Sequence, residues 1–208
     1  MDQSPHTTAQ KAETFRALHA APGSFLIANA WDAGSAKLLR GLGFSALATS
    51  SGAEAGVLGR VDGTVTRDEA LTHAKAIVDA VDLPVSADLE NCFADRPEDA
   101  ARAIAMAVEI GLAGASIEDA TGDPTKPLYD AGFAAERVAA AVTAARAAGF
   151  PFVLTARTES FLYGNTDLAD GRRTRHCNGT QPGSLPEVGG TRSTARRDRR
   201  PGPVRTHR

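Results

Sequence analysis

Carboxylates stand at two places in the chain where they could bind a metal ion. Asp88 and Glu90 lie two residues apart at the end of an apolar run, and Glu118 ends the next such run. Side chains two residues apart in extended backbone point to the same face, so the first two carboxylates could share a cation. Mg2+ and Mn2+ prefer oxygen ligands and need only one or two carboxylates directly. Each acid could instead cap the helix that follows it, but three acids converging with an arginine favour a metal site.

Arginine, serine and glycine residues could hold an anionic substrate beside these acids. Arg157 ends a further apolar run, and its guanidinium could grip a carboxylate or phosphonate in bidentate fashion. A salt bridge from Arg157 to Glu118 or Glu159 is an equally open alternative. Three residues that follow a buried run could offer backbone N–H groups and hydroxyls to a substrate carboxylate, namely Ser50, Ser51 and Gly52. Such a sequence also commonly forms an ordinary turn.

Other kinds of catalytic site are not indicated. Cys92 has no visible base beside it, and a lone cysteine more often serves packing than catalysis. The histidines suggest neither a ligand cluster nor a catalytic triad: His6, His19, His73, His176 and His207. Neither a GxGxxG sequence nor a P-loop is present.

The elements that must position the acids follow a βα pattern. Short apolar runs predict strands, and segments of helical periodicity separate them, as in a parallel sheet of successive βα units. The predicted strands are 25–29, 45–49, 84–88, 113–118 and 152–157. In such folds the chemistry lies at the carboxyl ends of the strands. The residues at these ends are Asn29, Asp32, Thr49, Ser50, Ser51, Gly52, Asp88, Glu90, Glu118, Asp119, Arg157 and Glu159.

Helix boundaries are also visible in the sequence. Thr66 and Glu69 form a capping box at the start of a helix. Pro97 suits the first turn of a helix over 97–110, and an alanine-rich helix is predicted over 134–148; each stops at a glycine. A first helix, over about 8–19, precedes any strand and could close the bottom of a barrel.

The bulk composition is that of a soluble globular protein. The 208 residues are 42% hydrophobic and 23% charged, which is enough for a sizeable core. The start of the chain lacks the pattern of a signal peptide, and no apolar run approaches the roughly 20 residues of a membrane span. We therefore expect a cytoplasmic protein with no membrane partner. Cys92 and Cys177 are far apart, which argues against a disulfide framework or a thiolate zinc site.

The charge balance changes abruptly near residue 170. Residues 1–170 carry 13 Lys and Arg against 23 Asp and Glu, whereas residues 171–208 carry ten Arg against Glu187 and Asp198. The second segment has no helical or strand period, so we do not expect it to form a packed core. We interpret 1–170 as a partial barrel domain and 171–208 as an arginine-rich tail from a shifted reading frame or truncation. A basic arm for nucleic acid is the weaker alternative, since aromatic residues for base stacking are missing.

Four motifs, in order, resemble the isocitrate lyase and phosphoenolpyruvate mutase superfamily over about residues 15–167. They are AWDAGSAKLLRGLGFSALATSSGAEAGVLGRVDG, SADLEN, SIEDA and TARTESF. The resemblance implies a (β/α)8 TIM barrel that uses Mg2+ or Mn2+ to act on C–C or P–C bonds of a small keto acid, hydroxy acid or phosphonate through an enolate-like species. It implies Asp88 as direct metal ligand, with Asp62, Glu90 and Glu118 binding through water. It also implies substrate binding by Ser50, Ser51, Gly52 and Arg157, and catalytic roles for Arg157 and Glu118.

Two departures from the superfamily pattern affect the expected activity. The loop after Glu118 reads EDATGDPTKPLYD where the lyase branch carries a KKCGH-type cysteine motif, which argues against isocitrate or methylisocitrate lyase activity. The mutase-like branch, with phosphonopyruvate and oxaloacetate hydrolases and carboxyvinyl-carboxyphosphonate phosphorylmutase, remains open, and Lys126 lies in its gating loop. The family also continues through three further βα units that this chain does not supply. An inactive or aggregated fragment, or one that depends on association with other copies, is therefore the alternative to an active enzyme. The resemblance implies a homo-oligomer for the family, which we do not expect of this shortened chain.

Overall fold

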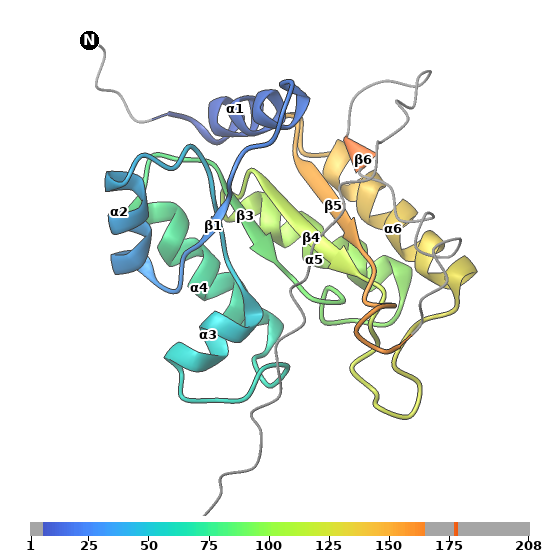
Figure 1. Ribbon diagram of the computed structural model, residues 1–208. Helices are drawn as coiled ribbons and strands as arrows, with labels where there is room; N and C mark the ends of the chain where they lie inside the picture. The colour runs from blue at the N-terminus through green and yellow to red at the C-terminus, as the bar shows by residue number, and fades with distance from the viewer. Residues whose placement is uncertain (1–5, 165–176, 179–208) are drawn as a thin grey trace, which may run out of the picture.

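The structure is a computed structural model and describes residues 6–164 and 177–178. Within these residues, parallel strands follow one another across a sheet in chain order (Figure 1). They are β1 (Ala28–Asn29), β2 (Leu47–Ala48), β3 (Val85–Asp88), β4 (Gly114–Glu118) and β5 (Val153–Arg157). Doubly wound sheets reverse their strand order, whereas parallel strands that neighbour one another in chain order are the arrangement of a (β/α)8 barrel, of which the described residues form a part.

Helices pack against the sheet, and α1 lies across one end of its strands (Figure 1). They are α1 (Thr8–Ala20), α2 (Ala33–Gly41), α3 (Ser51–Val57), α4 (Arg67–Ala80), α5 (Pro97–Glu109) and α6 (Ala131–Arg146). Phe15 of α1 packs with Ala46, Ala113 and Val153 at the starts of strands. The first helix thus covers the amino ends of the strands, as the sequence predicts for a helix that closes the barrel bottom.

The helix starts follow local capping chemistry. The predicted capping box of Thr66 and Glu69 is present at α4, and Pro97 lies in the first turn of α5 as predicted. The start predicted for α6 is wrong by three residues. The Asp130 side chain accepts a hydrogen bond of 2.8 Å from the Gly132 N–H, so the helix already begins at Ala131. A carboxylate that satisfies a free N–H of the first turn fixes that start.

The first two strands are shorter than the runs 25–29 and 45–49 predict. Each pairs over only two residues. Phe25 and Ile27, which the first predicted run includes, pack against the cluster around α1. A two-residue strand that the sequence does not predict, β6 (Cys177–Asn178), pairs antiparallel with β5. Such a brief pairing leaves no period to detect. The rest of the segment 171–208, and with it the predicted tail, lies outside the described residues.

Alternation along the strands separates the core from the site. In β3, Val85 and Ala87 are buried against the helices, whereas Ser86 and Asp88 alternate with them and are only partly buried. Alternate side chains of a strand point to opposite faces, so the polar residues of β3 to β5 share the face away from the core. In the part of the chain that the structure covers, no helix has the length and apolar character needed to cross a membrane.

Candidate active site at the carboxyl ends of the strands

Three of the predicted site residues are the last residues of neighbouring strands. Asp88 ends β3, Glu118 ends β4 and Arg157 ends β5. The register pairs Asp88 with Ser116 and Glu118 with Arg157. Parallel strands in this register bring the three side chains to the same end of the sheet, where the sequence places them.

Asp88 is the centre of the polar contacts. Its carboxylate accepts hydrogen bonds from Arg157 Nη1 at 2.9 Å and from Ser116 Oγ at 3.2 Å. The backbone N–H and the hydroxyl of Ser51 both lie 3.4 Å from Asp88 Oδ2. The Asp88 N–H in turn donates to Thr49 Oγ1 at 3.0 Å. These contacts hold Asp88 in one orientation at the junction of three strands.

Arg157 joins the carboxylates of two strands and of the segment after β5. Its Nη2 lies 3.1 Å from Glu118 Oε2 and 2.6 Å from Glu159 Oε1, and its Nη1 binds Asp88. Burial alone would lower the pKa of Arg157, but these carboxylates outweigh it and raise that pKa. Both salt bridges that the sequence leaves open are therefore present, and the guanidinium is fixed among acids.

Two acids are held in surroundings that disfavour their charge. Burial, with the nearby carboxylates of Asp62 and Asp88, raises the pKa of Glu90 to about 7. Burial also raises the pKa of Glu118 to about 7, against the opposing effect of Arg157. The Oε1 atom of Glu90 is buried with no hydrogen-bond partner among the described residues. An excess of negative charge is thus concentrated at this end of the sheet.

The Ser-Ser-Gly sequence begins a helix, where the sequence analysis left a turn or an anion nest open. Ser50 is the N-cap of α3, with its Oγ 3.4 Å from the Ala53 N–H. Asp62 Oδ2 lies only 3.3 Å from where a Cβ on Gly52 would stand, so the loop after α3 folds back onto Gly52. The structure therefore brings Asp62 to the same site as Asp88 and Glu90. Asp32, at the end of the first strand, is the N-cap of α2.

Several supporting residues were missed by the sequence analysis. Ser116 was not named, although it lies two residues before Glu118 on the same face of β4. Asp119 was named only as a strand-end residue. It accepts from the Glu159 N–H and from Thr158 Oγ1, both at 2.8 Å, and so ties the ends of β4 and β5 together. The alternation of side chains could have indicated Ser116, whereas nothing in the sequence points to the partners of Asp119.

Cys92 and the histidines within residues 6–164 make no contact with Asp88, Glu118 or Arg157. Cys92 is buried, and burial raises the pKa of its thiol to about 12, in agreement with a packing role. His73 Nε2 contacts the Trp31 carbonyl oxygen at 2.7 Å, while His6 pairs with Asp82. His176 and His207 lie outside the described residues.

The donor set suits a hard divalent cation, although the side chains do not enclose one. Among residues 6–164, no three His, Cys, Asp or Glu side chains converge closely enough to hold a metal ion. Asp88 and Glu118 are instead ion-paired with Arg157. The all-oxygen donors, the unpartnered Oε1 of Glu90 and the raised pKa of two carboxyl groups fit a site that a cation would neutralise. Mg2+ or Mn2+ therefore stays a prediction.

Parallel βα units with carboxylates and an arginine at the strand ends define the class of (β/α)8-barrel proteins that place their site at this end. The family model for phosphoenolpyruvate phosphomutase matches residues 15–176, and the chain belongs to this family.

Relatives of known sequence and structure agree with this assignment. The 2-methylisocitrate lyase of Escherichia coli (strain K12) is 30% identical over 165 residues, which are 76% of this chain and 55% of the relative. A Burkholderia cenocepacia J2315 structure, provisionally described as a lyase/mutase, is 53% identical with a TM-score of 0.77, over 78% of this chain and 59% of its own. A structure of 2,3-dimethylmalate lyase, described as a member of the PEP mutase/isocitrate lyase superfamily, is 28% identical to this chain with a TM-score of 0.71. The match covers 81% of this chain and 59% of that one. The chain thus spans a little over half the length of these relatives.

Proposed function

We propose that this chain carries the strand-end site of a Mg2+-dependent lyase or phosphonomutase-like enzyme that acts on C–C or P–C bonds of small α-keto or α-hydroxy acids. The observation that carries the proposal is the Asp88 carboxylate, bound by Arg157 and surrounded by Glu90 and Glu118. The family assignment and the lyase relatives support it.

Asp88 is the proposed direct metal ligand, and Asp62, Glu90 and Glu118 are proposed to bind the ion through water. When bound, the ion would withdraw electron density from the keto and carboxylate oxygens of the substrate and stabilise the charge that forms as the adjacent bond breaks. Glu90 supports this role because one of its oxygens is buried with no hydrogen-bond partner in the part of the chain that the structure describes. Burial disfavours the ionised forms of the Glu90 and Glu118 carboxyl groups, and a bound cation would offset this cost.

The substrate carboxylate is proposed to lie beside Ser50, Ser51 and Gly52, where α3 begins. Arg157, at the carboxyl end of β5, would contact the same substrate. When the bond next to the keto group breaks, its electron pair remains on the substrate as an enolate-like species, and a guanidinium stabilises such a charge. The three carboxylates around Arg157 hold its guanidinium in place for this contact.

The loop after β4 favours the mutase-like branch over the cysteine-dependent lyases. Residues 119–130 contain no cysteine, and the Thr121 hydroxyl instead bonds the Lys126 carbonyl oxygen at 2.6 Å and closes a tight turn. Cys92 does not substitute, because its thiol is buried and its raised pKa keeps it protonated. We therefore propose that this loop determines whether the enzyme acts on a C–C or a P–C bond.

Two measurements on the full chain test the proposal. Calorimetric titration measures Mn2+ binding, and a turnover assay measures activity on a panel of α-keto acids, α-hydroxy acids and phosphonates. Asp88→Asn should weaken Mn2+ binding by at least about 100-fold, since loss of a ligand exceeds the effect of its supporting residues. Asp68→Asn is the matched control, because Asp68 is an exposed acid of α4. Unchanged Mn2+ affinity in Asp88→Asn would contradict the metal site. Metal binding without any turnover would support the inactive-fragment alternative.

A further inference from the structure

A buried arginine behind the site is bonded to main-chain oxygens. Arg137 of α6 is the largest fully buried side chain of the described residues. Its Nε donates to Asp95 O at 2.9 Å, its Nη1 to Glu118 O at 3.2 Å, and its Nη2 to Ala94 O at 2.7 Å and also to Asn91 O. Burying a charged group is costly unless its bonds are made. The bonds that offset this cost are therefore with the backbone of the loop after β3 and of Glu118, the last residue of β4, where a second loop begins.

The first of these loops follows β3 and contains Glu90. Its residues Glu90, Cys92 and Phe93 have positive φ angles of 49°, 61° and 55°. Residues other than glycine rarely adopt positive φ angles, and such a backbone conformation persists only where the surrounding structure holds it. Three of the Arg137 bonds fall within residues 91–95 of this loop.

Tyr129 connects the same arginine to the second loop, which follows Glu118. The guanidinium carbon of Arg137 lies 4.2 Å from the centre of the Tyr129 ring. The Tyr129 hydroxyl donates to Asp95 Oδ1 at 2.5 Å and accepts from Asn91 Nδ2 at 3.1 Å. Its backbone N–H donates to Asp119 O at 2.9 Å and closes the loop at its base. A further bond of 3.0 Å, from the Glu118 N–H to Glu90 O, joins the two loops directly.

We propose that Arg137 and Tyr129 are positioning residues that clamp the loops after β3 and β4 together and thereby fix Glu90 and Glu118 for metal and substrate binding. The inference rests on the proposed function, because it assigns the residues that set the geometry of that site. Neither side chain bonds the carboxylate of Glu90 or Glu118. Arg137 bonds the backbone that carries these acids, and the Tyr129 hydroxyl bonds side chains of the loop after β3.

The test compares Arg137→Lys and Tyr129→Phe with the wild-type chain. Lysine keeps the charge but cannot make the forked set of bonds, and phenylalanine keeps the ring below the guanidinium but loses the hydroxyl. Tyr129→Phe keeps the test valid if the buried Arg137→Lys change prevents folding. Arg146→Gln, in the last turn of the same helix, is the control.

Two measurements separate the clamp from the metal site. Maleimide labelling of Cys92, followed by peptide mass spectrometry, reports opening of the loop after β3, since this thiol is buried. Mn2+ titration reports the geometry of the acids. Tyr129→Phe should speed Cys92 labelling by about 3- to 10-fold, the usual effect of losing a hydrogen bond. Both variants should weaken Mn2+ binding by about 10- to 100-fold, as loss of groups that orient ligands does.

Each outcome decides one of the two proposals. Wild-type labelling rates in both variants would overturn the clamp, and so would faster labelling with unchanged Mn2+ affinity, which would show a purely structural role. If the wild-type chain binds no Mn2+, the proposed function fails, and the clamp is judged from Cys92 labelling and hydrogen exchange of the Glu118 amide. Slow exchange of that amide in the wild type and fast exchange in both variants would then support it, and equal exchange would overturn it.

Discussion

Glu90 shows how the position of one side chain determines its charge. It follows a strand whose last residue is Asp88, and its own carboxyl group is partly buried close to that acid and to Asp62. Water that would stabilise its charge is largely excluded, so the pKa rises to about 7 from an ordinary value of 4.5. The unfolded chain ionises this group near its ordinary value. Folding therefore favours the protonated form throughout the interval between the two values.

We expect Glu90→Gln to change how stability depends on pH. For a carboxyl group with a raised pKa, stability is fully present below about pH 4.5 and is lost as the pH rises through about 7. Glutamine resembles the protonated acid and does not titrate. In EDTA the variant should match the wild type near about pH 5 and exceed it near about pH 7.5, by on the order of 1–2 kcal/mol. Urea unfolding at both pH values measures this.

The control for this prediction is Asp68→Asn, which removes an exposed acid and should leave the difference between the two pH values unchanged. Glu69 and Asp82 have a lowered pKa, so their contribution to the stability of the protein grows with rising pH, opposite to that of Glu90. The comparison of variant with wild type cancels their contribution. Equal pH dependence in Glu90→Gln and wild type would mean that Glu90 ionises normally.

At the scale of elements, the contact between α1 and the strands depends on a residue without a side chain. Gly114 begins β4 and pairs with Val153 of β5. A Cβ at this position would lie 2.5 Å from Val153 O and 2.9 Å from Phe15 Cε1. The close approach of backbone and aromatic ring leaves no room for even a methyl group.

Gly114→Ala should therefore destabilise the protein by about 1–3 kcal/mol, the usual cost of inserting a methyl group into a filled core. Gly41→Ala is a matched control, because Gly41 ends α2 with no atom within 4 Å of the added Cβ, and alanine favours the helix. Relative to the wild type, the free energy of unfolding in urea should fall for Gly114→Ala and rise for Gly41→Ala. Equal stability of both variants would show that α1 moves aside freely.

The sequence predicts the parts of this site that depend on strand periodicity and misses those that depend on tertiary contact. Asp88, Glu118 and Arg157 could be placed because each ends an apolar run, and parallel strands end at one edge. Arg137 could not, since its partners are backbone oxygens of loops more than 18 residues away in the chain. Its sole signal is a charge at the spacing of Ala141 and Ala145, on the buried face of α6. The role of that charge follows only from the folded loops.

At the scale of the whole molecule, the first βα unit presents apolar side chains to solvent. Leu26, Leu38 and Leu42 are 80%, 71% and 76% exposed. Leu38 and Leu42 are four residues apart and share a face of α2, which lies at the periphery beside β1 (Figure 1). Among the described residues, β1 pairs only with β2.

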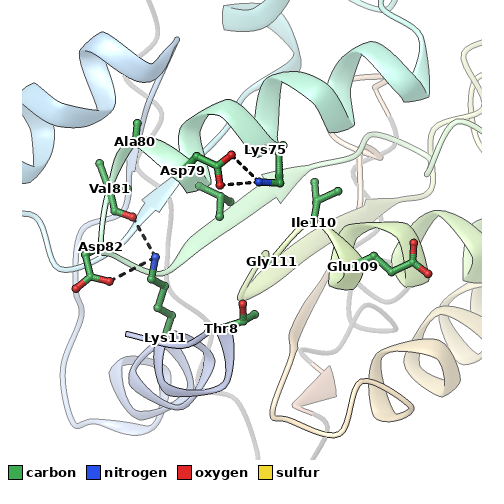
Figure 2. A pocket seen from close by; sticks show the side chains of 11 residues that line it. Thr8, Lys11, Lys75, Asp79, Ala80, Val81, Asp82, Glu109, Ile110 and Gly111 are labelled. Carbon is green, nitrogen blue, oxygen red and sulfur yellow. Dashed lines mark hydrogen bonds and ion pairs between the residues drawn. The ribbon is translucent and has the colours of Figure 1, made fainter. Parts of the chain in front are cut away.

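A surface cavity of about 510 Å3 lies between the start of α1 and the end of α4 and is polar, unlike the leucine surface (Figure 2). Its charged lining residues form two ion pairs, Lys11 with Asp82 and Lys75 with Asp79.

We expect this leucine surface to drive association between copies of the chain. Apolar surface removed from water contributes about 25 cal/mol per Å2, and an edge strand beside it offers free backbone groups. Sedimentation velocity at rising protein concentration should show oligomers for the wild type. Leu38→Lys combined with Leu42→Lys should shift the distribution to smaller species, because two charges would have to be buried in the contact. Val61→Lys, at an exposed residue of the loop after α3, is the control and should leave the distribution unchanged. A wild-type chain that remains monomeric at every concentration would show that this surface does not drive association.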